Sequence, residues 1–297
     1  MVELIPLLMF GVICLVLLAG FPVAFSLAGT ALIFAALGIA TNTFESAFLG
    51  AIPNRLYGDM TNMTLVAVPL FVFMGVLLEK SNLAQDLLSN MAEIIGGFRG
   101  SLAISVIFVG ALLAATTGIV GATVIAMGLI SLPTMLNNNY DRSLASGIVC
   151  SSGTLGQIIP PSIVLIIIAD QLASASDVAN QMRETEYKFL TGEFSMPGEF
   201  RVGSTSAGDM FLGALLPGLV LVGLYMLYVF VYARLNPKAA PPVPFKGQLD
   251  FKFWTKVIMV IIPPLALIFA VLGSILMGIA TVNQAGSIGA IGATIMA

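Results

Sequence analysis

Apolar runs long enough to cross a lipid bilayer recur along the whole of this chain. Crossing the hydrocarbon core takes about 20 apolar residues in a helix, because each backbone polar group must find its partner within the segment. Only 9% of the residues are charged, against about 25% in a soluble domain, so lipid must cover much of the surface. The sequence therefore predicts an all-α polytopic membrane protein. Its expected spans are residues 3–20, 22–40, 63–79, 100–136, 142–169, 210–233, 256–279 and 285–297.

The run 100–136 is too long for one straight crossing and too short for two, and it is interrupted at Ala115–Gly121 (ATTGIVG). The charged residues give an independent argument. Segment 234–256 carries five basic residues and one acid, which favours the cytoplasmic side, whereas 170–209 carries seven acids and three basic residues and is expected outside. The charges on the two sides of the membrane fit one topology only if the run 100–136 enters and leaves the membrane on the cytoplasmic side. We therefore expect a re-entrant helical hairpin.

The run 142–169 is interrupted by a polar stretch, Ser151–Ser162 (SSGTLGQIIPPS). Proline lacks a backbone N–H and clashes with the preceding turn, so Pro160 and Pro161 should break the helix near Gly156–Ile159. The break frees several carbonyl groups at one depth of the membrane. Freed carbonyls and the C-terminal ends of half-helices coordinate small cations, and N-terminal ends attract anions.

Two interrupted segments that meet near the membrane midplane indicate the site of a transporter. Sodium is a hard cation that prefers oxygen ligands, as the hard divalent ions do. The alternative is that the glycines and threonines serve close helix packing and that the prolines only kink a structural helix. Besides backbone carbonyls, the candidate groups are Ser151, Ser152 and Thr154 near the break, and Thr116, Thr117, Gly118, Gly121 and Thr123 near the hairpin tip.

Three further segments carry expectations of their own. Residues 80–98 show apolar positions at helical spacing and predict an amphipathic helix along the membrane surface, or else a soluble helical loop. Residues 173–209 are polar and glycine-rich and predict a solvated periplasmic loop, which alternatively touches a binding protein. The chain stops inside the apolar run 285–297, which suggests a fragment of a longer protein.

Both interrupted segments resemble those of a known family, the large membrane subunit of tripartite ATP-independent periplasmic (TRAP) transporters. The stretch GTLGQIIPPS (Gly153–Ser162) is the most specific part of the resemblance, which covers essentially the whole chain. The segments that carry it are Gly147–Leu172, Ala67–Ser81, Ala115–Leu136 and Gly208–Tyr228. Full members of the family are larger than this chain.

The resemblance implies an inverted-repeat, elevator-type secondary transporter of the bacterial inner membrane, not an enzyme. Such a protein would import a small organic acid, a carboxylate for example, together with Na⁺. The partners implied are a small membrane subunit, separate or fused, and a periplasmic substrate-binding protein. No cofactor besides the coupling ion and no nucleic acid are expected.

The resemblance also implies which residues hold the ion. The expected Na⁺-binding positions are Thr117, Val120, Gly156, Ile159 and Pro160. Further positions expected to line the substrate and ion cavity are Thr116, Gly118, Thr154 and Gln157. Relatives often have serines at the hairpin tip; here Val120 offers only its carbonyl.

The second repeat of such a transporter opens at Ala280–Ala290, which is similar to the family pattern A-T-P-T-E-A. Thr281 matches the pattern, whereas Asn283 and Gln284 replace a threonine and a glutamate. All three are expected to line the cavity, but the negative charge is lost. Coupling at this second position is therefore expected to differ from that of relatives.

Two other functions lack the sequence features that they would need. A passive channel would need short repeated filter loops, and an intramembrane hydrolase would need a catalytic set; the chain has no histidine and no Gly-x-Ser-x-Gly motif. The main alternative is a Na⁺ symporter of a related inverted-repeat family that needs no binding protein. The expected organisation is 1–98 scaffold and surface helix, 99–172 first transport repeat, 173–209 periplasmic loop, 210–256 connecting helix and basic cytoplasmic loop, and 257–297 the start of an incomplete second repeat.

Overall fold

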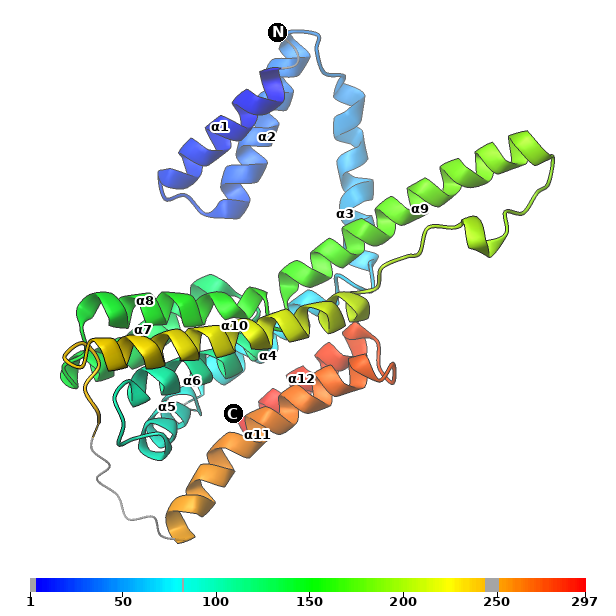
Figure 1. The fold of residues 1–297 in the computed structure, drawn as a ribbon. Coiled ribbons are helices and arrows are strands. Elements are labelled where there is room, and N and C mark those ends of the chain that lie inside the picture. The colour runs from blue at the N-terminus through cyan, green and yellow to red at the C-terminus, as the bar shows by residue number, and fades with distance from the viewer. Residues whose placement is uncertain (1–3, 82, 244–250) are drawn as a thin grey trace. The chain divides into compact units, whose positions relative to one another are not determined.

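The computed structural model describes residues 4–81, 83–243 and 251–297. The described residues form helices and irregular connections without a strand, which confirms the all-α prediction. They divide into two compact units, Met1–Asn62 and Met63–Ala297. Figure 1 shows the helices of both units.

The first unit is built on two antiparallel apolar helices and a third, shorter one. Its elements are α1 (Ile5–Leu18), α2 (Val23–Ala40), η2 (Ser46–Ala51) and α3 (Ile52–Thr61). No residue of α1 is buried, and α2 buries only Ser26 and Thr30. Apolar side chains therefore face outward on both helices, as expected of a surface covered by lipid.

The second unit holds the remaining helices. They are α4 (Ala67–Lys80), α5 (Leu83–Ile94), α6 (Ser101–Thr117), α7 (Val120–Asn137), α8 (Arg142–Thr154), η3 (Leu155–Gln157), α9 (Ile163–Thr191), η4 (Gly198–Phe200), α10 (Ala207–Leu235), α11 (Phe251–Leu276) and α12 (Val282–Met296). The basic cytoplasmic loop expected before α11 falls partly on residues 244–250, outside the described residues.

Within the described residues, five helices are long and apolar enough to cross a membrane, and six if the bent pair α4–α5 counts as one span. The five are α2, α7, α9, α10 and the part Val257–Leu276 of α11. Together with the shorter apolar helices α1 and α6, they confirm a polytopic membrane protein.

Two hydrophobic clusters hold the second unit together. The larger joins α5, α6, α7, α8 and α10 around fully buried residues such as Val106 and Leu155. The smaller joins α4, α11 and α12 around Phe71 and Val271, and takes in Ile166 of α9. The larger cluster surrounds both interrupted segments and so fixes their relative position.

The expected hairpin is confirmed. Helix α6 ends at Thr117, the chain reverses over Gly118 and Ile119, and α7 begins at Val120. At the open end, the buried Tyr140 hydroxyl lies near the backbone of Leu102, and burial raises the pKa of this tyrosine to about 12. Its re-entrant position in the membrane stays a prediction.

The expected helix break is also confirmed. Helix α8 ends at Thr154, the single turn η3 follows, and regular helix resumes only at Ile163. Ser162 caps the new helix: its hydroxyl oxygen accepts from the Leu165 N–H at 3.4 Å and donates to the Gln157 carbonyl at 2.8 Å. The two halves of the span are thus separate helices.

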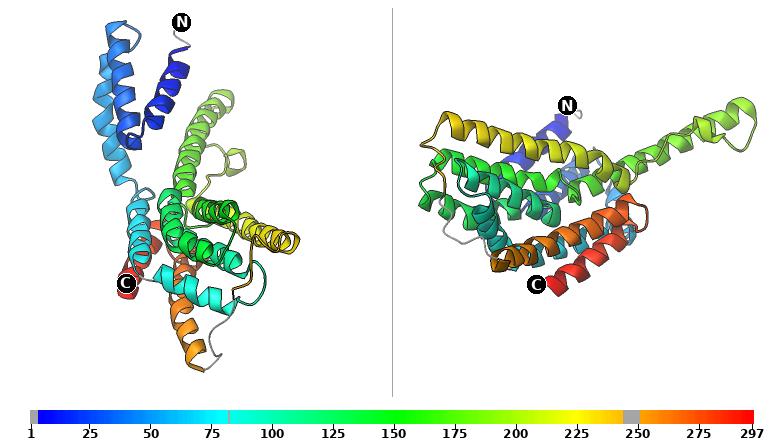
Figure 2. Two further views of the ribbon diagram at one scale, coloured as in Figure 1. Left: turned by 90° about the vertical axis from the view of Figure 1, so that its left-hand side faces the viewer. Right: turned by 60° about the horizontal axis from the view of Figure 1, so that its bottom comes forward.

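The prediction of a loop over 173–209 is wrong for its first half, because α9 continues without interruption to Thr191. Figures 1 and 2 show this part of α9 projecting beyond the neighbouring helices of the second unit. Polarity indicates contact with water, not irregular backbone, and alanine, glutamate, glutamine and lysine all favour helix. Only 192–206, with the single turn η4, returns as an irregular segment to α10.

The amphipathic helix expected over 80–98 is present as α5, but its apolar face does not lie open to lipid. Leu87, Leu88 and Met91 are buried in the larger cluster, where α5 packs against α6. An apolar stripe is stabilised by any apolar cover, and here the protein supplies it. The placement of α5 along the membrane surface stays a prediction.

Candidate functional site

The tip of the hairpin touches the break between α8 and α9. Gly118 has φ +60°, a left-handed conformation that favours glycine. A Cβ atom added to Gly118 would lie 3.2 Å from the Pro161 carbonyl oxygen and 3.5 Å from the Ile163 nitrogen. The two interrupted segments, about 40 residues apart in sequence, therefore meet at one point.

Close packing of α8 between the two arms of the hairpin fixes this meeting point. A Cβ on Gly110 of α6 would lie 2.6 Å from the Ser152 Cβ, and a Cβ on Gly153 would lie 2.3 Å from Cγ2 of Val124 in α7. Gly156 in η3 faces Ala114 of α6, whose Cα would be 3.6 Å from an added Cβ. Glycine thus lets three helices approach at backbone distance.

Four helix ends converge where the hairpin tip meets the break. Helix α6 and the η3 turn end there with their carbonyl groups, while α7 and α9 begin there with their N–H groups. Because proline has no N–H, the carbonyls of Gly156 and Gln157 lose the donors four residues ahead that a continuous helix would supply. The Ser162 hydroxyl replaces the donor only for Gln157. Partial charges of both signs are therefore concentrated at one place.

The structure places all five predicted Na⁺-binding positions at the tip or the break. Thr117 is the last residue of α6, and its side chain is outside the described part of the structure; Val120 is the first residue of α7. Gly156, Ile159 and Pro160 are buried in the break. The Ile159 side chain packs against Gly218 of α10, 3.2 Å from the position of an added Cβ, so only its backbone can bind an ion.

The hydroxyl groups near the site donate to carbonyls one turn earlier in their own helices. These bonds join Thr116 to Leu113 (2.7 Å), Ser151 to Ile148 (3.1 Å), Ser152 to Val149 (3.0 Å) and Thr154 to Ser151 (2.8 Å). Each hydroxyl oxygen keeps its lone pairs, so it can still accept a bond or contact a cation. Thr154 and Gln157 are exposed, whereas Thr116 and Ser152 are buried.

The residues predicted from the second repeat lie in a separate cavity of about 720 Å³. Thr281, Asn283 and Gln284 line it from the start of α12, and Asp170 lines it from α9. At 1.5 Å per residue, Asp170 is about 10 Å along α9 from Ile163 at the break. The structure thus brings the hairpin tip and the break together, and places the second group elsewhere.

A capping box at the start of α12 explains two of these residues. The Thr281 hydroxyl accepts from the Gln284 N–H at 3.3 Å, and the Gln284 side chain accepts from the Thr281 N–H at 3.0 Å. Asn283 donates to the Met63 sulfur at 3.8 Å. The amide of Gln284 is therefore engaged in holding the helix start.

Sequence reasoning missed part of this cavity. Its wall includes Met63 and Thr64, which precede α4, and the segment Ser204–Gly208, which leads into the first turn of α10. No local pattern marks these residues, because distant parts of the chain bring them together. It also missed Gly110, whose only sequence signal is a glycine inside an apolar helix that has several other small residues.

The comparison with protein families shows to which family this chain belongs. The chain matches the profile of the tripartite ATP-independent periplasmic transporter, DctM component, over residues 10–183 and 194–297. The chain belongs to this family. The resemblance seen in the sequence is confirmed, and the relatives are named as transporter permeases rather than as enzymes.

Individual relatives agree with the family. The chain is 30% identical to the C4-dicarboxylate TRAP transporter large permease protein of Vibrio cholerae over 96% of its own length and 54% of the relative. It is 29% identical to the protein of the same name from Rhodobacter capsulatus, over 96% and 58%. The ectoine TRAP transporter large permease protein of Halomonas elongata is 26% identical over 78% and 46%. The chain spans about half the length of these curated relatives.

Proposed function

We propose that this chain forms part of a Na⁺-coupled secondary transporter that imports a small organic acid delivered by a periplasmic binding protein. The observation that carries the proposal is the contact of Gly118 with Pro161 and Ile163, which joins two broken segments at one point. Paired interruptions of this kind form ion and substrate sites in transporters. The family supports a TRAP-type secondary transporter.

The proposed ion site uses the backbone oxygens of the tip and the break, at Thr117, Val120, Gly156, Ile159 and Pro160. Gly156 contributes because its carbonyl has lost a helical donor to the following prolines. A cation there would compensate the partial negative charge of two helix C-terminal ends. Binding of the ion would tie the hairpin tip to the break.

The proposed substrate is an anion. The N–H groups at the starts of α7 and α9 lie where the hairpin tip meets the break. Helix N-termini favour carboxylates. Two relatives bear the name of a C4-dicarboxylate transporter, which is consistent with this class. The close packing of α6, α7 and α8 would let them move as one body in an elevator mechanism.

The proposed partners are a small membrane subunit and a periplasmic substrate-binding protein, in the bacterial inner membrane. Family membership supports such a three-part system. The second candidate function, a Na⁺ symporter that needs no binding protein, differs only in this last requirement.

Uptake by the complete transporter in proteoliposomes tests the proposal. We expect uptake of a carboxylate when both external Na⁺ and the binding protein are present, and loss of uptake when choline replaces Na⁺. Unchanged uptake in choline would refute sodium coupling. Full uptake without the binding protein would select the second candidate.

A further inference from the structure

The outer part of α9 and the segment that returns from it form a separate projecting element. We call residues 173–206 the α9 extension: helix from Ala173 to Thr191, then the returning segment 192–206. It projects beyond the neighbouring helices of the second unit (Figures 1 and 2). The family profile matches the chain on both sides but leaves out 184–193. The outer end of the extension is thus a feature of this chain that the profile does not include.

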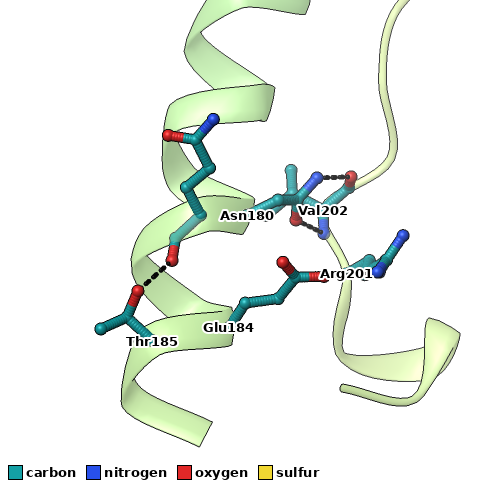
Figure 3. Close-up of polar contacts among 6 residues, drawn as sticks. Asn180, Glu184, Thr185, Arg201 and Val202 are labelled. Atoms are coloured by element: carbon teal, nitrogen blue, oxygen red, sulfur yellow. Dashed lines mark hydrogen bonds and ion pairs between the residues drawn. The ribbon is translucent and has the colours of Figure 1, made fainter. Parts of the chain in front are cut away.

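Polar contacts clamp the returning segment along one face of the helix. Asn180 donates to the Val202 carbonyl at 3.0 Å and accepts from the Val202 N–H at 2.7 Å. Glu184 forms an ion pair with Arg201, as Figure 3 shows. Arg183 also donates to the Phe200 carbonyl at 3.0 Å. The extension is therefore an ordered element, held by hydrogen bonds and an ion pair between residues about 20 positions apart.

The opposite face of the same helix carries an exposed apolar stripe. Val178, Met182 and Phe189 follow one another at spacings of four and seven residues, which places them within about 40° around the helix. They are 51%, 69% and 88% exposed. Together with Gln181, Thr185 and Glu186 they line a shallow groove of about 600 Å³. The clamped residues lie on the far side, so the returning segment leaves this stripe uncovered.

Whether the stripe lies in lipid or in water depends on its distance from the membrane midplane. This distance rests on the proposed function, in which the break lies near the midplane. Half of the hydrocarbon core is about 15 Å, or about 10 helical residues. Helix α9 starts at Ile163 and so leaves the lipid near Ala173. Val178 and Phe189 then lie about 8 and 24 Å beyond it, in water.

We propose that this stripe is a docking surface for the soluble substrate-binding protein. An apolar stripe kept in water on a clamped helix marks an interaction surface. It lies beyond the start of α10, at the end opposite Arg234, where a periplasmic partner would approach. The extension carries five acids and three basic residues. The complementary patch on the binding protein would therefore be apolar with a basic rim.

The double variant Met182→Ser with Phe189→Ser tests the proposal in the complete transporter. We expect the concentration of binding protein that gives half-maximal uptake to rise about tenfold or more, because large apolar residues dominate docking energies. The maximal rate and the Na⁺ dependence should stay unchanged. Leu190→Ser is the matched control: Leu190 is 73% exposed in the same helix turn but lies about 100° from Phe189. It should shift the half-saturating concentration less than twofold.

Each outcome separates the two proposals. Wild-type uptake that needs the binding protein, with no shift in the double variant, overturns the docking surface and leaves the proposed function standing. Wild-type uptake without any need for the binding protein overturns both. A double variant that changes self-association of the transporter in detergent, while binding-protein titration is unchanged, assigns the stripe to a second copy and also overturns the proposal.

Discussion

A methyl group on Gly153 of α8 would lie 2.3 Å from Cγ2 of Val124 in α7, and 3.0 Å from the Val124 Cα and nitrogen. On the other side of α8, Gly110 of α6 approaches Ser152 almost as closely. The first half of the broken span is therefore held between the two arms of the hairpin. This contact, about 30 residues apart in sequence, aligns the tip with the break.

Gly153→Ala should destabilise the protein by about 1–3 kcal/mol, because the obstacle is partly backbone and the helices must separate to admit the methyl group. Gly147→Ala is the matched control in the same helix, since an added Cβ there meets nothing within 4 Å. It should be neutral or stabilising by up to about 1 kcal/mol. Thermal unfolding in detergent measures both, and equal melting temperatures for the two variants would contradict the packing argument.

Gly156→Leu should abolish uptake while membrane insertion stays intact, because the larger side chain has no room against Ala114 and would force η3 away from α6. Gly156→Ala should keep most of the activity, since its Cβ would make ordinary contacts of 3.6–3.7 Å with Ala114. Uptake in proteoliposomes and the amount of folded protein in the membrane are the two measurements. Full uptake by the leucine variant would count against the site.

Gly118→Ala should destabilise the hairpin tip by about 1–2 kcal/mol, because residues other than glycine pay this cost in the left-handed conformation. The new methyl group would also press on the Pro161 carbonyl at 3.2 Å. Gly121→Ala, in the first turn of α7, meets no atom within 4 Å and serves as the control. Half-maximal Na⁺ concentration for uptake should rise in the first variant only; a shift of equal size in both would refute a role for the tip.

Thr281→Ala should cost about 1 kcal/mol, the usual loss when a helix N-cap is removed. Gln284→Glu should keep the stability near that of the wild type, because glutamate fills the same place in a capping box. Thermal unfolding compares the variants. If Gln284→Glu proved as damaging as Thr281→Ala, the capping box would not explain these residues.

Asp141 gives a pH-dependent prediction. It caps α8 by accepting from the Ser143 and Leu144 N–H groups, each at 3.1 Å, and the Ser143 hydroxyl holds the pKa of Asp141 below its usual 3.8. A lowered pKa means that the folded state favours the charged form, so its contribution is complete above pH 3.8 and is lost as the pH falls through the lowered value. The difference in melting temperature between wild type and Asp141→Ala should therefore be constant at neutral pH and shrink below pH 3.8. A difference that grew on acidification would contradict this sign.

The interrupted segments show how far sequence reasoning reached. The polar stretch that contains Pro160 and Pro161 and the glycine-containing stretch around Gly118 marked both interruptions in the sequence. Proline alone does not decide a break, because α11 continues through Pro263 and Pro264. The helix beyond Leu172 was not foreseen, because polarity was taken as irregular backbone. The burial of Leu87 and Met91 against α6 was not foreseen either, since an amphipathic pattern does not say whether lipid or protein covers it.

By itself the sequence predicted a helical membrane protein with one hairpin and one broken span, because apolar length, flanking charge and interrupting polar stretches can be read without any tertiary contact. Only the tertiary structure decided that Gly118 meets Pro161 and that Gly153 meets Val124. It also separated Thr281 and Gln284 into another cavity and gave them a capping role. Such contacts depend on how closely distant helices approach, and local patterns carry no information about that distance.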